Sequence, residues 1–221
     1  MKLLHSFLGK LVDVGLSGKK LPLRGSLIDV GNDIIVLHNG SQFTYIPTLH
    51  LQYMTLAEDP TAVDPAPQPE LPFDHSEIAY RKILMNAKGI FSEISISGSQ
   101  SLHGYVTSIM NDFFVFFSPV YRTVYISLEH VKSITPYISN TTPYSLGQDR
   151  FPLHPTGTTL SRTFEQQLKK LVGELVVFNL GEAPNKIGRL NVAENNMLEL
   201  VTANGQQLFM HMSHVKSVHL P

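Results

Sequence analysis

One motif occurs three times in this chain and constrains its fold more than any other feature. It consists of a strand end, a polar turn with one histidine, and a second short strand. The three copies span residues 45–54, 125–134 and 209–218. Their turn histidines are His50, His130 and His214. Three occurrences in 221 residues predict three copies of one structural unit rather than one large domain.

Other landmarks keep the same spacing around the motif. An anchor glycine precedes each histidine: Gly25, Gly104 and Gly188. Seven residues after each anchor lies an asparagine that begins a polar pair: Asn32, Asn111 and Asn195. A first glycine precedes the anchors by 16, 15 and 15 residues: Gly9, Gly89 and Gly173. The shared spacing extends the repeat well beyond the histidine motif.

The residues between these landmarks predict β-strands. Val12, Val14 and Leu16 alternate with other residues, as expected for a strand with one buried face. The Asn-Asp or Asn-Asn pair is typical of a tight hairpin turn. Each copy then holds about five short strands, and closing them into a small barrel removes exposed strand edges. We therefore predict an all-β protein with short helices, built from three tandem barrel modules.

The predicted organisation has three repeats and two linkers. The repeats cover 1–57, 76–136 and 159–221, and the linkers 58–75 and 137–158. The first linker is rich in proline and acids, so we expect it to be extended. Apolar residues on one face predict helices over 76–88 and 163–172, with Asp74 and Glu77 at a capping start. Repeat 1 carries a truncated version with four apolar residues: Leu3, Leu4, Phe7 and Leu8.

The first repeat resembles an Sm-like barrel, a relative of the SH3-like barrels. The resemblance rests on Gly9, Val12, Val14 and Leu16, followed by Gly25 and Leu27. It implies a strongly bent five-stranded barrel. Sm-type RNA binders place an Asp and an Asn further along the loop, whereas this turn is shortened to residues 31–33. The family's RNA-binding positions are therefore not recognisable here.

Nearly the whole chain resembles the spore coat protein B family of endospore-forming bacilli. The resemblance rests on residues 128–134 and 213–218 and on the loop 181–190. It implies a structural protein of the outer spore coat, assembled from the mother-cell cytoplasm. Fuller members of that family carry a Ser- and Lys-rich tail, which does not follow Pro221 in this sequence.

Composition narrows the possible functions. The net charge is −1 at pH 7, a poor fit to a protein that holds phosphate backbones. The absence of cysteine excludes disulfides and thiolate sites. No apolar stretch fits a signal peptide or a membrane span. The sequence contains no nucleophile-elbow, phosphate-loop or zinc-protease motif. We therefore expect no enzyme activity and no cofactor. We also expect no membrane contact and no nucleic-acid partner.

The repeated polar residues favour a structural interpretation over a chemical one. His50, His130 and His214 occur once per repeat, which favours turn hydrogen bonding over metal binding, although a metal-linked assembly stays open. His211 makes a local pair with His214 in the third repeat alone. Asn32, Asn111 and Asn195 are interpreted as turn residues rather than as cation sites.

An aromatic run in the second repeat is our candidate assembly surface. It comprises Phe113, Phe114, Phe116, Phe117 and Tyr121. Aromatic platforms can stack bases, but a strand that is apolar on both faces needs cover on both. We therefore expect a spore coat scaffold that contacts itself or other coat proteins. The alternative is an Sm-like RNA-binding protein whose six modules form a ring as a dimer.

Overall fold

The computed structural model describes residues 2–58, 73, 78–97, 100–137, 141–147, 151 and 159–221. These residues are mostly β, with 15 strands in one antiparallel sheet and two short α-helices. The chain divides into two compact units. Unit 1 comprises Met1–His103 and Val131–Leu146, and unit 2 comprises Gly104–His130 and Gly147–Pro221. The prediction of a mainly β protein with short helices is confirmed.

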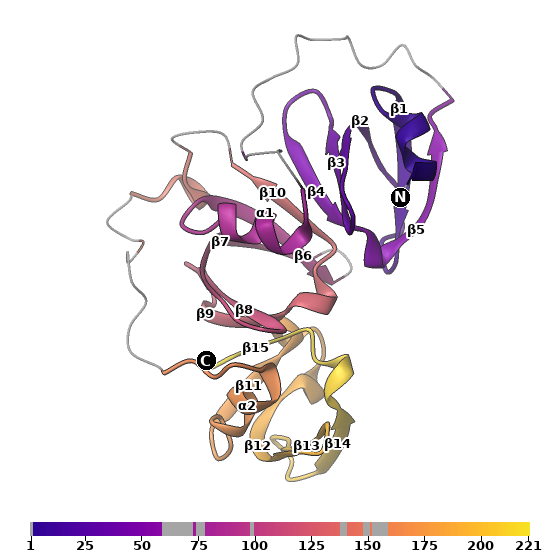
Figure 1. Cartoon of the computed structure of the whole chain (residues 1–221). Coiled ribbons are helices and arrows are strands. Elements are labelled where there is room, and N and C mark those ends of the chain that lie inside the picture. Colours follow the sequence, from indigo (N-terminus) through magenta and orange to yellow (C-terminus); the bar gives the residue numbers. More distant parts are fainter. Residues whose placement is uncertain are drawn as a thin grey trace. The chain divides into compact units, whose positions relative to one another are not determined.

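Unit 1 contains seven complete strands and the start of an eighth among its described residues (Figure 1). Their order in the sheet is β7-β6-β10-β4-β3-β2-β1-β5. The bounds are β1 (Leu11–Leu16), β2 (Leu23–Val30), β3 (Ile34–His38), β4 (Phe43–Pro47), β5 (Leu51–Leu56), β6 (Phe91–Ser97), β7 (Gln100–Ile109) and β10 (Ser133–Pro136).

Unit 2 contains the rest of β7 and seven further strands among its described residues. Their order is β14-β13-β12-β11-β15-β9-β8-β7. The bounds are β8 (Phe113–Ser118), β9 (Arg122–Ser127), β11 (Leu175–Phe178), β12 (Ile187–Glu194), β13 (Met197–Val201), β14 (Gln207–His211) and β15 (Ser217–His219). Within each sequence repeat, the fourth, third, second, first and fifth strands follow one another in the sheet.

The helices are shorter than predicted. α1 spans Tyr80–Asn86 and α2 spans Phe164–Lys169. The truncated version in repeat 1 is a 3-10 helix, η1 (Lys2–Phe7). Asp74 and Glu77, the predicted capping pair, lie outside the described residues, as do most residues of the two predicted linkers.

Each motif histidine ends a single turn of 3-10 helix. These turns are η2 (Thr48–His50), η4 (Leu128–His130) and η9 (Met212–His214). Three further 3-10 turns of the same length among the described residues are η5 (Pro143–Ser145), η7 (Asn179–Gly181) and η8 (Pro184–Lys186). The predicted polar turn is thus a helical turn that joins the fourth strand of each repeat to the fifth.

The anchor glycines allow a close approach between the second and third strands of each repeat. A Cβ at Gly25 would lie 2.8 Å from the carbonyl oxygen of His38. Cβ atoms at Gly104 and Gly188 would overlap the carbonyl oxygens of Phe117 and Val201. Any side chain at these positions would push the strands apart, which explains why glycine recurs there.

The strand that holds each anchor glycine also carries a β-bulge. The register shifts lie between Leu27 and Asp29, between Val106 and Ser108, and between Leu190 and Val192. In each repeat the extra residue lies three positions after the anchor glycine. A bulge bends its strand and increases its twist. The three repeats therefore bend their second strands at the same point.

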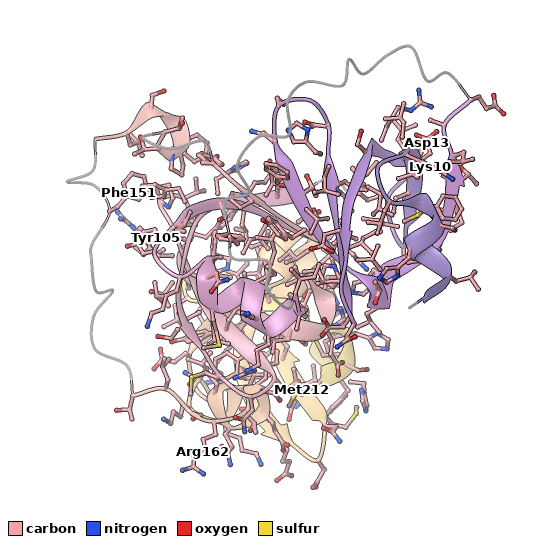
Figure 2. The ribbon with its side chains drawn as sticks, turned by 45° about the horizontal axis from the view of Figure 1, so that its top comes forward. Lys10, Asp13, Tyr105, Phe151, Arg162 and Met212 are labelled. Carbon is pink, nitrogen blue, oxygen red and sulfur yellow. The ribbon has the colours of Figure 1, made fainter. Side chains whose placement is uncertain are left out.

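Each unit contains a described apolar core. In unit 1, one cluster is built from β1 to β4, with Val12, Val14, Leu27 and Ile35 fully buried. In unit 2, a larger cluster joins residues of β8, β9, α2 and β11 to β15. Tyr105 and Phe151 of the same unit are also buried and lie together in Figure 2, with ring centroids 6.4 Å apart.

Candidate functional site

The contacts that join one sequence repeat to the next are the candidate functional site. We call such a contact a joint. In each joint, the fifth strand of one repeat pairs with the fourth strand of the preceding repeat. Unit 1 holds the β10–β4 joint and unit 2 holds the β15–β9 joint.

The unit 2 joint has a continuous backbone ladder. Ser217, Val218 and His219 pair with Ile126, Tyr125 and Val124. Just before the ladder, the Ser127 N–H donates to the Lys216 carbonyl at 3.0 Å. Ser127 is itself buried. The backbone groups that face each other across the joint are therefore paired, as a buried sheet requires.

Apolar side chains cross the same joint. Tyr125 of repeat 2 is 4% exposed and belongs to the cluster that holds Val218, Val176 and Leu190 of repeat 3. Phe113 lies 5.7 Å from Phe164 of α2, measured between ring centroids. The core of repeat 3 thus includes side chains from repeat 2, so the joint is stabilised by apolar burial as well as by hydrogen bonds.

The unit 1 joint has a shorter ladder. Its one registered pair is Ile134 with Tyr45. Tyr45 is fully buried, and its ring centroid lies 5.0 Å from that of Phe73. The position of Ser127 is occupied here by Pro47, which has no N–H to donate. Burial raises the pKa of the Tyr45 hydroxyl, and the negative charge of Asp29 raises it further.

Polar side chains in and beside the two strands add bonds to the unit 1 joint. Thr44 and Thr135 hydroxyls are 3.1 Å apart. The Lys132 ammonium donates to Ser17 Oγ at 2.8 Å and to His50 Nδ1 at 2.9 Å. Because an ammonium only donates, His50 Nδ1 must accept and carries no proton. His50 therefore contacts the next repeat through its ring.

His130 makes a different contact at the unit 2 joint. Its Nε2 lies 2.9 Å from the carbonyl oxygen of Ser213 in η9. A carbonyl only accepts, so Nε2 carries the proton. His50 and His130 thus both reach the following repeat, one as acceptor and one as donor. We expected bonds within their own turns, and the contacts between repeats could not be predicted from the motif.

His214 has another environment. Its ring centroid lies 6.4 Å from that of His211. His211 Nδ1 instead accepts from the Ser213 N–H at 3.2 Å and contacts Ser213 Oγ at 2.7 Å. In the described part of the chain, no group of three His, Asp or Glu side chains is placed to hold a metal ion.

A pocket of about 230 Å³ lies at the unit 2 joint. Its lining comes from the turns of both repeats: Asp112, Ser127, Glu129, His130, Phe164, Asn196, His211, Met212 and Ser213. Figure 2 labels Met212 at this site. The described lining holds two carboxylates and no lysine or arginine, which disfavours phosphate as a ligand.

The turn acids next to the asparagines have a role that the sequence did not reveal. Asp33 Oδ1 accepts from the Tyr80 N–H at 2.8 Å, and Asp112 Oδ1 accepts from the Phe164 N–H at 2.8 Å. Each carboxylate therefore caps the first turn of the helix in the next repeat. The third repeat has Asn196 at this position.

The predicted turn asparagines lie in the expected connections. Asn32 connects β2 to β3, Asn111 connects β7 to β8, and Asn195 connects β12 to β13. All three are exposed. Asn195 and Asn196 have φ values of 50° and 61°, in the left-handed region that asparagine tolerates.

The aromatic run does not form an exposed surface. Phe113, Phe114, Phe116 and Phe117 are all buried, none more than 4% exposed. Phe113 belongs to the apolar cluster of unit 2, and the ring centroid of Phe117 lies 5.5 Å from that of Tyr105. Tyr121 is partly exposed, and its ring centroid lies 5.2 Å from that of His219. The assembly surface that we expected at these residues is therefore covered by the chain itself.

Residues 163–218 match the model of the YwrJ third domain. Over 227 aligned residues the chain is 41% identical to the uncharacterized protein YwrJ of Bacillus subtilis (strain 168), with all of both chains covered. The chain belongs to the YwrJ family. The YwrJ third-domain match runs from the N-cap of α2 into β15, and so includes every strand of repeat 3.

The chain also resembles a second protein of the same organism. It is 25% identical to spore coat protein B of Bacillus subtilis (strain 168) over 144 residues. That match covers 65% of this chain and 36% of spore coat protein B. The similarity to YwrJ thus covers the whole chain, whereas the similarity to spore coat protein B covers 65% of it. Among the described residues, no helix is long and apolar enough to cross a membrane.

Proposed function

We propose that this protein is a structural component of the bacterial spore coat that acts as a scaffold through protein–protein contacts. The observation that carries the proposal is the similarity over 144 residues to spore coat protein B. The protein is placed in the coat from the mother-cell cytoplasm, and its partners are other coat proteins and further copies of itself. The role involves no catalysis, cofactor, membrane or nucleic acid.

The working parts of this scaffold are three small Sm-like or SH3-like barrels. Two repeated features support the barrels: the bulge in each second strand and the close approach at Gly25, Gly104 and Gly188. Strand order supports them too, because the fifth strand of each repeat lies beside the first. A small barrel closes when its strands bend strongly and its last strand pairs with its first.

Repetition suits a scaffold for a physical reason. Several similar contact surfaces on one chain make later contacts intramolecular, so weak contacts add to a stable assembly. The joints support this view, because a fifth strand and a fourth strand of successive repeats pair twice in the chain. A pairing mode that recurs within a chain is available between chains.

The test is the location of the protein in sporulating cells. We would express a fluorescently tagged chain in Bacillus subtilis in place of YwrJ and follow it through sporulation. We expect a signal that appears in the mother cell, encircles the forespore and remains with the extracted coat fraction. A diffuse signal that is absent from purified coats would overturn the proposal.

RNA binding is the outcome that would replace the scaffold role. We would titrate the purified chain with single-stranded RNA at several salt concentrations. A phosphate-binding protein loses affinity steeply as salt rises. We expect no such binding, and tight salt-dependent binding would favour the RNA alternative.

A further inference from the structure

Joints are formed by fourth strands and fifth strands. One fourth strand and one fifth strand take part in no joint among the described residues. β14 is the fourth strand of repeat 3, and within the described residues it pairs with β13 alone. β5 is the fifth strand of repeat 1, and it pairs there with β1 alone. Unit 2 thus ends its sheet at β14 and unit 1 ends its sheet at β5.

The exposed residue Phe209 marks β14 as an open joint surface. Phe209 occupies the position of Tyr45 and Tyr125 in the motif. Tyr45 and Tyr125 lie in the two internal joints and are 0% and 4% exposed, whereas Phe209 is 63% exposed. An aromatic side chain at the same place in the fold is therefore buried wherever the joint is made and exposed where it is not.

β5 shows the same contrast with its counterparts. β10 and β15 are buried along their whole length, whereas β5 is exposed or half-buried throughout. Tyr53 is 50% exposed and Leu56 is 53% exposed. Leu49, in the turn just before β5, is 69% exposed. Apolar side chains are thus exposed at both open edges.

Neither edge carries the charges that normally protect an exposed strand. β5 reads Leu-Gln-Tyr-Met-Thr-Leu and β14 reads Gln-Leu-Phe-Met-His, so both lack Lys, Arg, Asp and Glu. Proteins usually place lysine, proline or a short strand at an edge to prevent pairing with another chain. These edges have five or six residues and no such protection.

We propose that β14 of one molecule pairs with β5 of a second copy, forming a joint between chains. The inference rests on the proposed scaffold function and names the surface through which the protein contacts itself. Transferring the register of the two internal joints places Met54 opposite Phe209, as Ile134 faces Tyr45 and Val218 faces Tyr125. The contact is head-to-tail, so each chain offers one edge of each type.

The backbone of β14 suits the internal joint with the longer ladder. His211 occupies the position of Ser127, whose N–H donates to Lys216. His211 is extended, with φ −79° and ψ 137°, and unlike Pro47 it has an N–H. The joint between chains therefore resembles the ladder in unit 2 rather than the shorter ladder in unit 1.

Two edge variants of the full chain test the proposal. Phe209→Lys places a charge on the β14 edge. Met54→Pro removes an N–H from β5 at the position of Val218, which faces β9 in the unit 2 joint. Leu21→Lys is the control, because Leu21 is 79% exposed and lies outside both edges. Masses would be measured by light scattering over a range of concentrations, and folding by circular dichroism.

We expect the natural chain and Leu21→Lys to gain mass with concentration, and each edge variant to remain a single chain. Mixing the two edge variants is the decisive step. Phe209→Lys keeps β5 and Met54→Pro keeps β14, so the mixture forms a complex of one copy of each and grows no further. That result also shows that both variants fold.

Three outcomes would overturn the proposal. They are a natural chain that stays single at every concentration, edge variants that assemble as well as the natural chain, or a mixture that forms no complex. Failure of the scaffold role is distinguishable from these. A chain that is absent from the spore coat but pairs through these edges in solution contradicts the proposed function alone, and a coat-located chain with unaffected edge variants contradicts this inference alone.

Discussion

The two internal joints have the same strand topology but are held by different groups. In unit 2, three residue pairs and the Ser127 N–H form a backbone ladder. In unit 1, one pair is registered, and the Thr44–Thr135 contact and the Lys132 ammonium supply side-chain bonds. Pro47, at the position of Ser127, has no N–H to donate to a matching bond. The two joints thus keep one strand topology with different hydrogen bonds.

The largest expected effect comes from the aromatic residue at the centre of each joint. We predict that Tyr125→Ala and Tyr45→Ala each lower the free energy of unfolding by about 3–5 kcal/mol, the usual cost of deleting a buried aromatic ring. Phe209→Ala should change it by about 0.5 kcal/mol or less when the chain is dilute, because that ring is exposed. Denaturant unfolding at low protein concentration measures all three. Equal losses at Tyr45 and Phe209 would contradict the contrast between closed and open joints.

The next effect concerns the backbone donor that distinguishes the joints. Ser127→Pro should destabilise unit 2 by about 1–3 kcal/mol, because the Lys216 carbonyl loses its donor. Ser127→Ala keeps the N–H and serves as the control. Hydrogen exchange should show faster exchange at Ser217, Val218 and His219 in the proline variant. Unchanged exchange would mean that the ladder does not depend on this bond.

Helix capping across the joints is expected to have a smaller effect. Asp112→Ala and Asp33→Ala each remove an acceptor from a helix N–H in the next repeat. The usual loss for such a cap is about 0.5–2 kcal/mol. Thermal unfolding of each variant checks this value. Asp112→Asn is the comparison, because the asparagine keeps a side-chain oxygen that can accept from the Phe164 N–H.

Acid should weaken the two units through different buried histidines. Burial lowers the pKa of His219 in β15 and of His38 in β3 below the ordinary value of 6.5. The unfolded chain therefore binds more protons just below pH 6.5, so stability falls as the pH falls through that value. His219→Leu should reduce this loss in the unit 2 joint, and His38→Leu should reduce it in unit 1. Hydrogen exchange on either side of pH 6.5 separates the two, and equal acid sensitivity of the natural chain and both variants would contradict the prediction.

Much of the local structure could be predicted from the repeat spacing. The alternation of Val12, Val14 and Leu16 placed β1 correctly, and the polar pairs marked the three hairpin connections. Such features depend on neighbours in the chain, so a sequence pattern reveals them. The helices were predicted too long, because apolar periodicity does not indicate where a helix is capped.

The partners of the candidate site residues were not predictable in this way. Asp33 bonds a residue 47 positions away, Asp112 one that is 52 away, and Lys132 reaches His50 across 82 positions. The aromatic run of β8 indicated that both faces of the strand need cover, but the sequence does not show whether this chain or another molecule supplies that cover. These contacts depend on which repeat follows which in space.

The sequence by itself determined that this protein repeats one β-rich unit three times, because spacing and periodicity are written along the chain. It also determined the positions of the special glycines and turn residues. Only the tertiary structure decided that fifth strands pair with fourth strands of the preceding repeat. Apart from proline, every residue offers the same backbone groups at a strand edge, so the choice of partner depends on register, bulges and side-chain cover in three dimensions. The same physics leaves Phe209 exposed at one edge and buries Tyr45 and Tyr125 at the others.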